Sequence, residues 1–359
     1  MKIRACHARP SRTRPTIEAS AGRDDTLAYL TGCLIALTLP WGSAIAADTS
    51  VAGPVTPEEV VNSLEASFGV HPGQRRNHIK GTCASGEFVG DREAAALSRS
   101  RLFSGAPIPA IVRFSVAGGN PNVSDAAKNA RGMAIELDLR DGSKQHMTML
   151  NTPVFGAASP GTFNAMVVAT RPDPLTGKPD PKKIESFFAS HPDALSQAAF
   201  LKGKAPPWSY ATAPYYSIHT FRFIDSAGTA HPVKWRFVPR DGERQLTEAQ
   251  LQSAGKNFLE QRLIDRAAHG AIQWDMVVYV GERGDSEDNP TLAWPETRRH
   301  FVAGTLTLTK VMPQQGAACE KINFDPLVMA DGIQPTHDPV LLFRSPAYAI
   351  SFGKRLSGH

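Results

Sequence analysis

One helical face near the end of the chain combines a tyrosine with two arginines. Arg344 stands four residues before Tyr348 and Arg355 stands seven residues after it, and on a helix these offsets place the three side chains on one face. An arginine one turn away favours the ionised phenol, because a neighbouring positive charge stabilises the anion. A phenolate is a hard ligand suited to ferric iron and is one of the axial ligands of haem. An exposed basic helix face has the same spacing, so the spacing alone leaves both interpretations open.

Two further side chains could take part in such a site. Arg355 would stand about 10 Å beyond Tyr348 along the helix, within reach of a carboxylate at the edge of a large cofactor. His78 lies in the basic segment 75–81, and histidine is the side chain whose unperturbed pKa is closest to neutral pH. Taken alone, however, His78 is typical of a surface histidine and Tyr348 of a half-buried core tyrosine. Neither residue alone indicates a function.

The elements that must position these residues are mostly short strands. Alternating or β-branched runs, separated by Gly, Pro, Asp or Asn, occur at 110–116, 133–139, 145–150, 219–224, 233–238, 272–280 and 304–309. The content of 29 glycines and 28 prolines requires many turns and makes an all-helical bundle a poor interpretation. The pattern favours an antiparallel sheet or a closed barrel with helices added.

Four helices are predicted around the strands. The first begins at Thr56, and the other three cover 181–201, 246–269 and 338–355. Thr56 is the N-cap of a capping box that Glu59 completes, and the two middle helices are amphipathic. The last helix, which carries Tyr348, has Asp338 as its N-cap, and Pro346 is expected to kink it. The sequence contains no internal repeat and no glycine-rich phosphate loop, and nothing indicates a nicotinamide site.

Residues 1–46 have the layout of a secretory leader. Basic residues precede an apolar run over 27–39, and small residues follow over 42–47. This order is typical of a signal peptide cleaved after Ala46 or Ala47. The run is shorter than the roughly 20 residues that span a bilayer. We therefore predict export to the periplasm, a mature domain over 47–359, and no stable membrane insertion once the leader is removed.

Other interpretations of the N-terminal segment fit less well. The residues ending at Cys33 resemble a lipoprotein cleavage box, but Asp24 and Asp25 leave little apolar length before it. The charged stretch is long for a signal peptide, so translation starting downstream of Met1 is an alternative. The leader contains six basic and three acidic residues, and its removal lowers the net charge from +5 to +2. The mature charge therefore gives no indication of a nucleic-acid partner.

Cysteines and acidic residues in the mature chain suggest few other sites. Cys83 and Cys319 are the two cysteines outside the leader, and no C-x-x-C spacing occurs. In an oxidising compartment they form one disulfide or stay apart, and the sequence leaves this open. An acidic turn could bind Ca²⁺, although a solvated loop is the simpler interpretation; it contains Asp285, Glu287 and Asp288. His146, Met147 and Met149 are assigned no role.

Short motifs in a constant order resemble the catalase family of haem proteins over about residues 70–355. They are Arg75-x-x-His78-x-Lys80-Gly81, Arg113-Phe114-Ser115-x-Ala117-Gly118, Arg131-Gly132, Asn151-Thr152-Pro153-Val154-Phe155, His219-Thr220-Phe221, Trp294-Pro295, Phe324-Asp325-Pro326, Gly332-Ile333-x-Pro335 and Arg344-x-x-x-Tyr348. So many ordered matches are hard to obtain by chance. The chain is therefore identified as a member of this family.

The resemblance implies a fold and a cofactor. It implies an α+β fold built on an eight-stranded antiparallel β-barrel with surrounding helices, and haem b bound in a pocket beside the barrel. It makes Tyr348 the iron ligand and Arg344 the partner of the Tyr348 phenolate. It also makes His78 the distal acid–base group and Ser115 the residue that orients His78. In this role one histidine takes a proton from the bound peroxide and returns it to the departing oxygen.

The resemblance also implies contacts at the edge of the haem and above it. It makes three arginines the partners of the haem propionates, namely Arg75, Arg113 and Arg355. It places Phe163 in the lining of the distal cavity, which suits an apolar side chain. The oxidised cofactor left after the peroxide reacts must then be reduced by a second substrate.

One position departs from the family pattern in a way that bears on this second substrate. Typical catalases have two consecutive asparagines before Thr-Pro, and the first is the distal amide that positions hydrogen peroxide. Here the two positions are Leu150 and Asn151. Leucine cannot donate a hydrogen bond, so we expect the reduction of the cofactor by a second peroxide to be impaired.

The sequence also ends at His359, soon after the proximal helix. We expect the segments that cover the haem in full-size catalases to be absent, which would admit organic reductants. Together with Leu150, this predicts a haem peroxidase that reduces hydrogen peroxide or organic hydroperoxides with a small organic electron donor and has little catalase activity. Alternatives are a true catalase, a non-enzymatic haem carrier or sensor, and a lipid hydroperoxide isomerase. A homo-oligomer is compatible with the sequence.

Overall fold

The computed structural model describes residues 54–358, and the predicted leader, with Cys6 and Cys33, lies outside the described residues. The strands are β1 (Gly81–Gly90), β2 (Pro107–Val116), β3 (Arg131–Asp138), β4 (Lys144–Leu150), β5 (Tyr215–Tyr216), β6 (Phe221–Ile224), β7 (Ala230–Pro239), β8 (Ile272–Val280), β9 (His300–Pro313) and β10 (Ile333–Pro335). The α-helices are α1 (Pro57–Phe68), α2 (Arg92–Ala95), α3 (Pro160–Ala169), α4 (Pro181–Ser190), α5 (Leu195–Lys202), α6 (Glu248–Ser253), α7 (Phe258–Ala268), α8 (Ala318–Lys321) and α9 (Pro339–Leu356). No helix within 54–358 is both long and apolar enough to cross a membrane.

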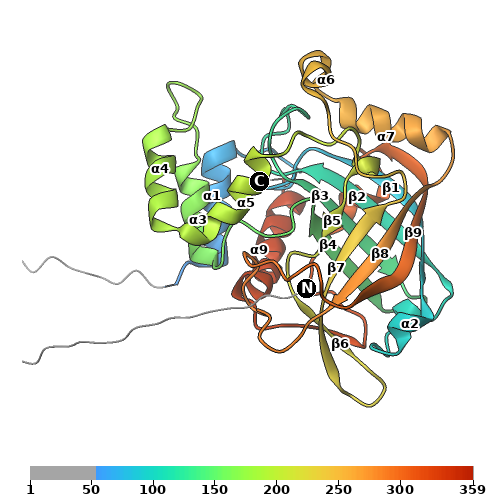
Figure 1. Cartoon of the computed structure of the whole chain (residues 1–359). Helices are drawn as coiled ribbons and strands as arrows, with labels where there is room; N and C mark the ends of the chain where they lie inside the picture. The colour runs from blue at the N-terminus through green and yellow to red at the C-terminus, as the bar shows by residue number, and fades with distance from the viewer. Residues whose placement is uncertain (1–53, 359) are drawn as a thin grey trace, which may run out of the picture. The chain divides into compact units, whose positions relative to one another are not determined.

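Eight strands close into an antiparallel barrel, as predicted (Figure 1). Their order is β7-β5-β4-β3-β2-β1-β9-β8, and pairing of β7 with β8 completes the ring. Strands β6 and β10 extend the sheet beside β7. Closure removes the unpaired edges that an open sheet would present. The barrel is therefore a rigid base for side chains that point outward from its strands.

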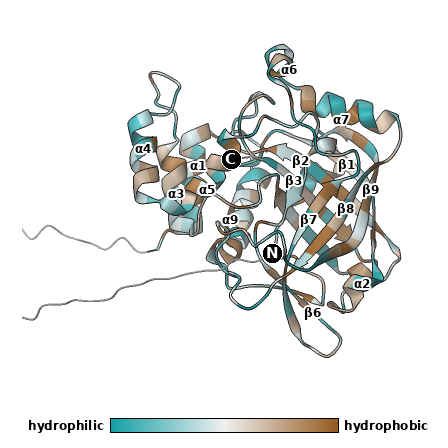
Figure 2. Ribbon diagram, viewed as in Figure 1, coloured by the Kyte–Doolittle hydropathy of each residue, from teal (hydrophilic) through white to brown (hydrophobic). Residues whose placement is uncertain are grey.

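The inside of the barrel is filled by large apolar side chains, many of them aromatic. Hydrophobic residues are visible along barrel strand β8 in Figure 2. Phe114 lies 5.2 Å from Tyr210 and 5.7 Å from Trp274 between ring centroids, and all three are almost fully buried. Burying a side chain of this size contributes roughly 1.5–3 kcal/mol. Because successive residues of a strand point to opposite faces, the neighbours of Phe114 along β2 point away from this core.

Most of the helical material lies on one side of the barrel. Helices α1, α3, α4 and α5 form a group there, and α9 lies between this group and the barrel (Figure 1). Helix α1 begins at Thr56, whose side chain accepts from the Glu59 amide at 3.2 Å in the predicted capping box. On the other side, α7 packs against β9.

Strand β1 was not among the predicted strands, and its composition explains why. It contains three glycines and no regular apolar alternation. A side chain at Gly86 would collide with the backbone of Thr307 and Leu308 on β9, and one at Gly90 with the backbone of Leu102. Because the neighbouring backbone approaches closely, glycine is required at these positions, and glycine interrupts the hydrophobic pattern by which a strand is predicted.

Two predicted helices are interrupted. The helix expected over 181–201 ends at Ser190, and α5 begins at Leu195 after a short 3-10 turn, because Pro192 cannot continue a helical ladder. The helix expected over 246–269 is divided into α6 and α7 around Gly255. Helix α3 was missed, because it is apolar on all sides and so lacks an amphipathic period.

Candidate functional site

A large cavity lies against the outer face of the barrel, between strands β2 to β4 and helices α1, α3 and α9. Its empty volume, which includes space open to solvent, is about 1290 Å³. Seven of the eight predicted site residues line it: Arg75, His78, Arg113, Ser115, Phe163, Arg344 and Tyr348. The eighth, Arg355, lies farther along α9 and donates to the Lys321 carbonyl at 3.4 Å.

Strand register sets two rows of side chains along the barrel wall of this cavity. One row consists of Ser115, Gly132 and Leu150, and the other consists of Arg113, Ala134 and Thr148. Residues two apart along a strand point to the same face, so both rows face outward while Phe114 faces the core. The small residues in the middle of the rows, Gly132 and Ala134, leave space between the larger side chains at the ends.

His78 is held in a fixed position above the first row. Its Nδ1 lies 2.9 Å from Oγ of Ser115, which leaves Nε2 as the ring nitrogen for a substrate. The backbone of His78 is left-handed, with φ +54°, a conformation that costs of order 1–3 kcal/mol in a non-glycine residue. Asn77 Oδ1 accepts from the amides of His78 and Gly118, both at 2.8 Å, and stabilises this turn.

Two glycines make room for the histidine and its support. A Cβ atom at Gly132 would lie 2.8 Å from Oγ of Ser115 and 3.1 Å from Nδ1 of His78. A Cβ atom at Gly81 would lie 2.5 Å from Nη2 of Arg113, the atom that donates to the His78 carbonyl at 2.7 Å. The approach of His78 to the barrel therefore depends on the absence of both side chains.

The surroundings keep His78 neutral. Burial, together with the positive charges of Arg113, Arg344 and Arg75, lowers its pKa to about 3. A neutral imidazole has a lone pair that can accept a proton. His78 is therefore suited to act as a base over the whole range near neutral pH.

Tyr348 faces the same cavity from α9. Arg344, one turn earlier, donates from Nη2 both to the Tyr348 hydroxyl and to Oγ1 of Thr148, each at 2.8 Å. The predicted helical pairing is thus present, and it is anchored to the second row of the barrel wall. Asp338 caps the helix by accepting from the amides of Val340 and Leu341, as predicted, and α9 continues past Pro346 to Leu356.

A buried histidine–aspartate pair supports this helix and was missed in the sequence. Nδ1 of His219 lies 2.6 Å from Oδ2 of Asp338, and both side chains are 1% exposed. Burial lowers the pKa of His219, although Asp338 acts in the opposite direction. His219 lines the cavity, and its Nε2 and Nη1 of Arg344 are buried without a hydrogen-bond partner in the described residues. The two residues are 119 positions apart, so the sequence predicted the N-cap role of Asp338 but not its contact with His219.

Arg75 and Arg113 of the cavity lining have Arg355 nearby. Within the described residues, all three donate hydrogen bonds to uncharged oxygens. Nη2 of Arg75 donates to the carbonyls of Cys319 and Ile322 at 3.1 and 2.7 Å. Arg113 donates to backbone carbonyls and to the Gln314 side chain, and Arg355 donates to a carbonyl of α8. Burial lowers the pKa of Arg75, and Arg113 and Arg355 repel its charge. Such a cluster favours an anion between its members.

Most of the remaining lining is apolar. Phe163 of α3 stacks on Phe155 with ring centroids 5.7 Å apart, and both line the cavity. Leu150 lies in the same row as Ser115 and also lines the cavity. Its side chain offers an apolar surface where an amide would offer hydrogen bonds.

These residues fit a large, planar, anionic cofactor. The cavity wall is largely apolar, Tyr348 offers an oxygen ligand, and the arginines, whose hydrogen bonds go to uncharged oxygens, suit carboxylates. This is the combination of groups that a haem requires from its protein.

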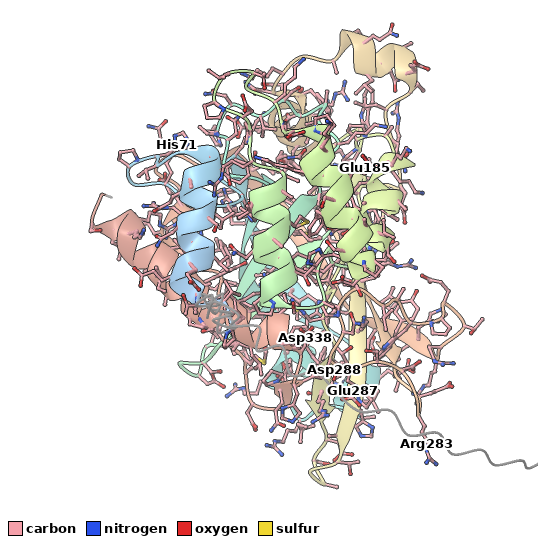
Figure 3. All side chains as sticks on the ribbon, turned by 90° about the vertical axis from the view of Figure 1, so that its left-hand side faces the viewer. His71, Glu185, Arg283, Glu287, Asp288 and Asp338 are labelled. Carbon is pink, nitrogen blue, oxygen red and sulfur yellow. A yellow bond between two sulfur atoms is a disulfide. The ribbon has the colours of Figure 1, made fainter. Side chains whose placement is uncertain are left out.

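Other predicted features lie outside the cavity. The structure pairs Cys83 with Cys319 in a disulfide, with Cα atoms 5.7 Å apart. The acidic turn, in the loop between β8 and β9 (Figure 3), forms ion pairs: Asp285 with Arg298 and Glu287 with Arg222. No group of three or more potential metal ligands occurs within 54–358. His146 binds Glu136 at 2.9 Å instead of facing the cavity.

Comparison with known proteins agrees with this geometry. A model of the catalase family matches residues 71–359. The chain is 54% identical over 304 residues to a catalase-related peroxidase of Synechococcus elongatus, covering 85% of this chain and 90% of that protein. It is 32% identical over 302 residues to a catalase-related peroxidase of Mycolicibacterium paratuberculosis, covering 84% and 95%.

Solved structures of catalases share the fold. A fungal catalase superposes with a TM-score of 0.73 at 22% identity, over 80% of this chain and 60% of its own. Catalase A from Saccharomyces cerevisiae gives the same TM-score at 23% identity, over 80% and 62%. These likenesses support the barrel alone, and this chain spans about three fifths of the length of those catalases.

Fold and site together define a barrel protein with a cofactor cavity on the outer wall, bounded by a histidine on one side and a tyrosine on another. The chain belongs to the catalase family, whose members typically bind haem.

Proposed function

We propose that this chain is a haem peroxidase that reduces hydrogen peroxide or organic hydroperoxides with an organic electron donor. The observation that carries the proposal is the shared cavity of the His78–Ser115 pair and the Arg344–Tyr348 pair. The 54% identity to a catalase-related peroxidase supports the same activity.

The residues of the cavity would hold haem b by its iron and its carboxylates. Tyr348 would bind the iron, with its phenolate stabilised by the Arg344 hydrogen bond. Arg75, Arg113 and Arg355 would meet the propionates, and Phe163 would cover one face. When bound, the haem supplies the iron centre at which the peroxide bond is cleaved and from which electrons pass on.

His78 would move the proton that the reaction requires. Its neutral ring accepts the proton of the peroxide oxygen and returns it to the departing oxygen, so one residue acts first as base and then as acid. Ser115 fixes the ring through Nδ1 and so keeps Nε2 directed to the substrate. Over a complete cycle the peroxide receives two electrons and two protons, and two donor molecules each supply one electron.

Leu150 would determine which molecule supplies those electrons. An amide at this position would bind a second hydrogen peroxide, and the leucine side chain cannot form those hydrogen bonds. An organic donor that reacts without that amide is then the more effective reductant. The position of Leu150 in the row of Ser115 supports this assignment.

The test compares two activities of the purified protein loaded with haem. We expect rapid oxidation of a phenolic or aminic donor and slow oxygen release from hydrogen peroxide. Leu150→Asn should raise oxygen release relative to donor oxidation, while the exposed Leu175→Asn should leave the ratio unchanged. Oxygen release at the rate of true catalases, with negligible donor turnover, would contradict the proposal.

Export to the periplasm is part of the same proposal. The leader pattern over 1–46 supports it, and so does the Cys83–Cys319 disulfide, because such bonds persist in oxidising compartments. N-terminal sequencing of the protein from the periplasmic fraction should give a chain that begins after Ala46 or Ala47. A full-length chain found only in the cytoplasmic fraction would refute export.

A further inference from the structure

The disulfide joins the barrel wall to the short helix beside the arginine cluster. Cys83 lies on β1 directly opposite Arg113 on β2, and Cys319 belongs to α8. The two cysteines are 236 positions apart and at most 2% exposed. They pack with Ala317 and Phe324 in a small apolar cluster separate from the barrel core.

Backbone carbonyls of the α8 segment accept hydrogen bonds from Arg75 and Arg355. Nη2 of Arg75 lies 3.1 Å from the carbonyl of Cys319 itself and 2.7 Å from that of Ile322. Lys321, between them, accepts from Arg355 at 3.4 Å. The guanidinium of Arg75 also lies 5.7 Å from the ring centroid of Phe324. The position of the Arg75 guanidinium therefore depends on the α8 segment, and Arg355 contacts the same segment from α9.

Besides the disulfide, this segment is held by the apolar cluster and by Gln314, which contacts Arg113 and the Ile79 carbonyl. Helix α8 has four residues and no side-chain cap, and a single turn has almost no stability of its own. The arginines also repel one another: Arg113 and Arg355 both act against the charge of Arg75. The carboxylate of Glu320, on α8 itself, attracts all three arginines, so a displacement of α8 would also displace the arginines. A covalent bond to β1 opposes this displacement because it joins the segment to the closed barrel.

We propose that the Cys83–Cys319 disulfide is a positioning device for the cofactor: it fixes the α8 carbonyls and so presents Arg75 and Arg355 to the cofactor carboxylates. The inference rests on the proposed haem site. The two cysteines do not touch the reacting atoms, and their effect passes through the arginines. Binding of a porphyrin that has free carboxylates should therefore depend on the disulfide, and binding of one that lacks them should not.

The experiment titrates the haem-free full chain with iron protoporphyrin IX and with its dimethyl ester, whose carboxylates are blocked. Binding is followed by Soret absorbance. Cys83→Ala/Cys319→Ala should weaken haem binding by about tenfold, the lower end of what loss of outer-shell support costs at metal sites, and leave ester binding unchanged. Leu263→Ala, a buried substitution on α7, is the control for a general loss of stability and should not change the ratio of the two affinities.

A double-mutant cycle tests whether the arginine carries the effect. In an Arg75→Gln background, removal of the disulfide should weaken haem binding much less than in the wild type, because coupled residues are not additive. Circular dichroism checks that each variant is folded. If the cysteine variant does not fold, the wild-type disulfide can be reduced with a phosphine in mild denaturant and the protein returned to buffer for the same titrations.

The outcomes separate this inference from the proposed function. Equal weakening for haem and ester, or no weakening at all, would overturn the positioning role and leave the haem site intact. A wild-type chain that binds neither porphyrin would overturn the haem proposal, and the positioning role with it.

Discussion

Gly132 decides how closely the side chain of His78 approaches the barrel. A methyl group there would lie within 3.1 Å of Nδ1 of His78 and 2.8 Å of Oγ of Ser115, so both must move. We expect Gly132→Ala to slow the reaction of the haem-loaded protein with peroxide by at least about tenfold, because positioned proton transfer contributes 10²–10⁴-fold. The rate is measured by rapid mixing with hydrogen peroxide.

Gly255→Ala is the matched control for this substitution. A Cβ at Gly255 meets no atom within 4 Å, and its φ is not in the left-handed region, so the same change in composition should not affect the rate. Haem content and the Soret spectrum should be normal in both variants. An unaltered rate in Gly132→Ala would show that the His78–Ser115 distance does not limit proton transfer.

Residues close in sequence were more predictable than residues brought together by the barrel. The Arg344–Tyr348 pairing followed from helical spacing and is present at 2.8 Å. The His219–Asp338 pair links a loop before β6 to the start of α9, and no local pattern signals such a contact. Cys83 and Cys319 were left as paired or separate, since their spacing depends on where α8 packs.

At the scale of elements, the start of α9 has two roles that depend on one side chain. Asp338 caps the helix and also accepts from buried His219. Asp338→Ala should lower the free energy of unfolding by about 2–4 kcal/mol, from loss of a cap and from an unpaired buried imidazole. Urea unfolding measures the change.

Two comparisons separate the cap from the buried pair. Asp180→Ala removes the N-cap of α4, where Asp180 accepts from the Lys182 amide at 2.9 Å, and should cost about 1 kcal/mol. Asp338→Asn retains a capping oxygen and should fall between the two alanine variants. If Asp338→Ala cost no more than Asp180→Ala, the link to His219 would add nothing to stability.

Strands with a regular hydrophobic period were predicted well, whereas β1, which packs closely against neighbouring backbone, was not. The strands expected at 133–139 and 272–280 correspond to β3 and β8 within two residues. Strand β1 contains glycines because β9 and the segment at Leu102 approach it closely, and its pattern is lost as a result. The strands of the cavity wall could therefore be predicted in part. The disulfide between β1 and α8 could not, because it depends on how α8 packs against the barrel.

At the scale of the whole molecule, the cavity creates a dependence of stability on pH. Burial lowers the pKa of His78 from 6.5 to about 3 and lowers that of His219 as well. Below pH 6.5 the unfolded chain binds protons that the folded chain does not bind, so stability decreases as the pH falls. The loss continues down to about pH 3, where His78 becomes protonated in the folded chain too.

Urea unfolding of the haem-free chain at pH 7 and pH 5 tests this dependence. His78 should account for a loss of about 2 kcal/mol between the two values, since one proton binds only to the unfolded state. His78→Leu should remove that part of the loss, while the exposed His269→Gln should retain it. An equal loss in wild type and His78→Leu would mean that His78 is protonated alike in both states. Burial and the positive charges of the nearby arginines would then be too weak to exclude a further charge on His78. Two of those arginines, Arg113 and Arg75, are proposed to bind the cofactor carboxylates.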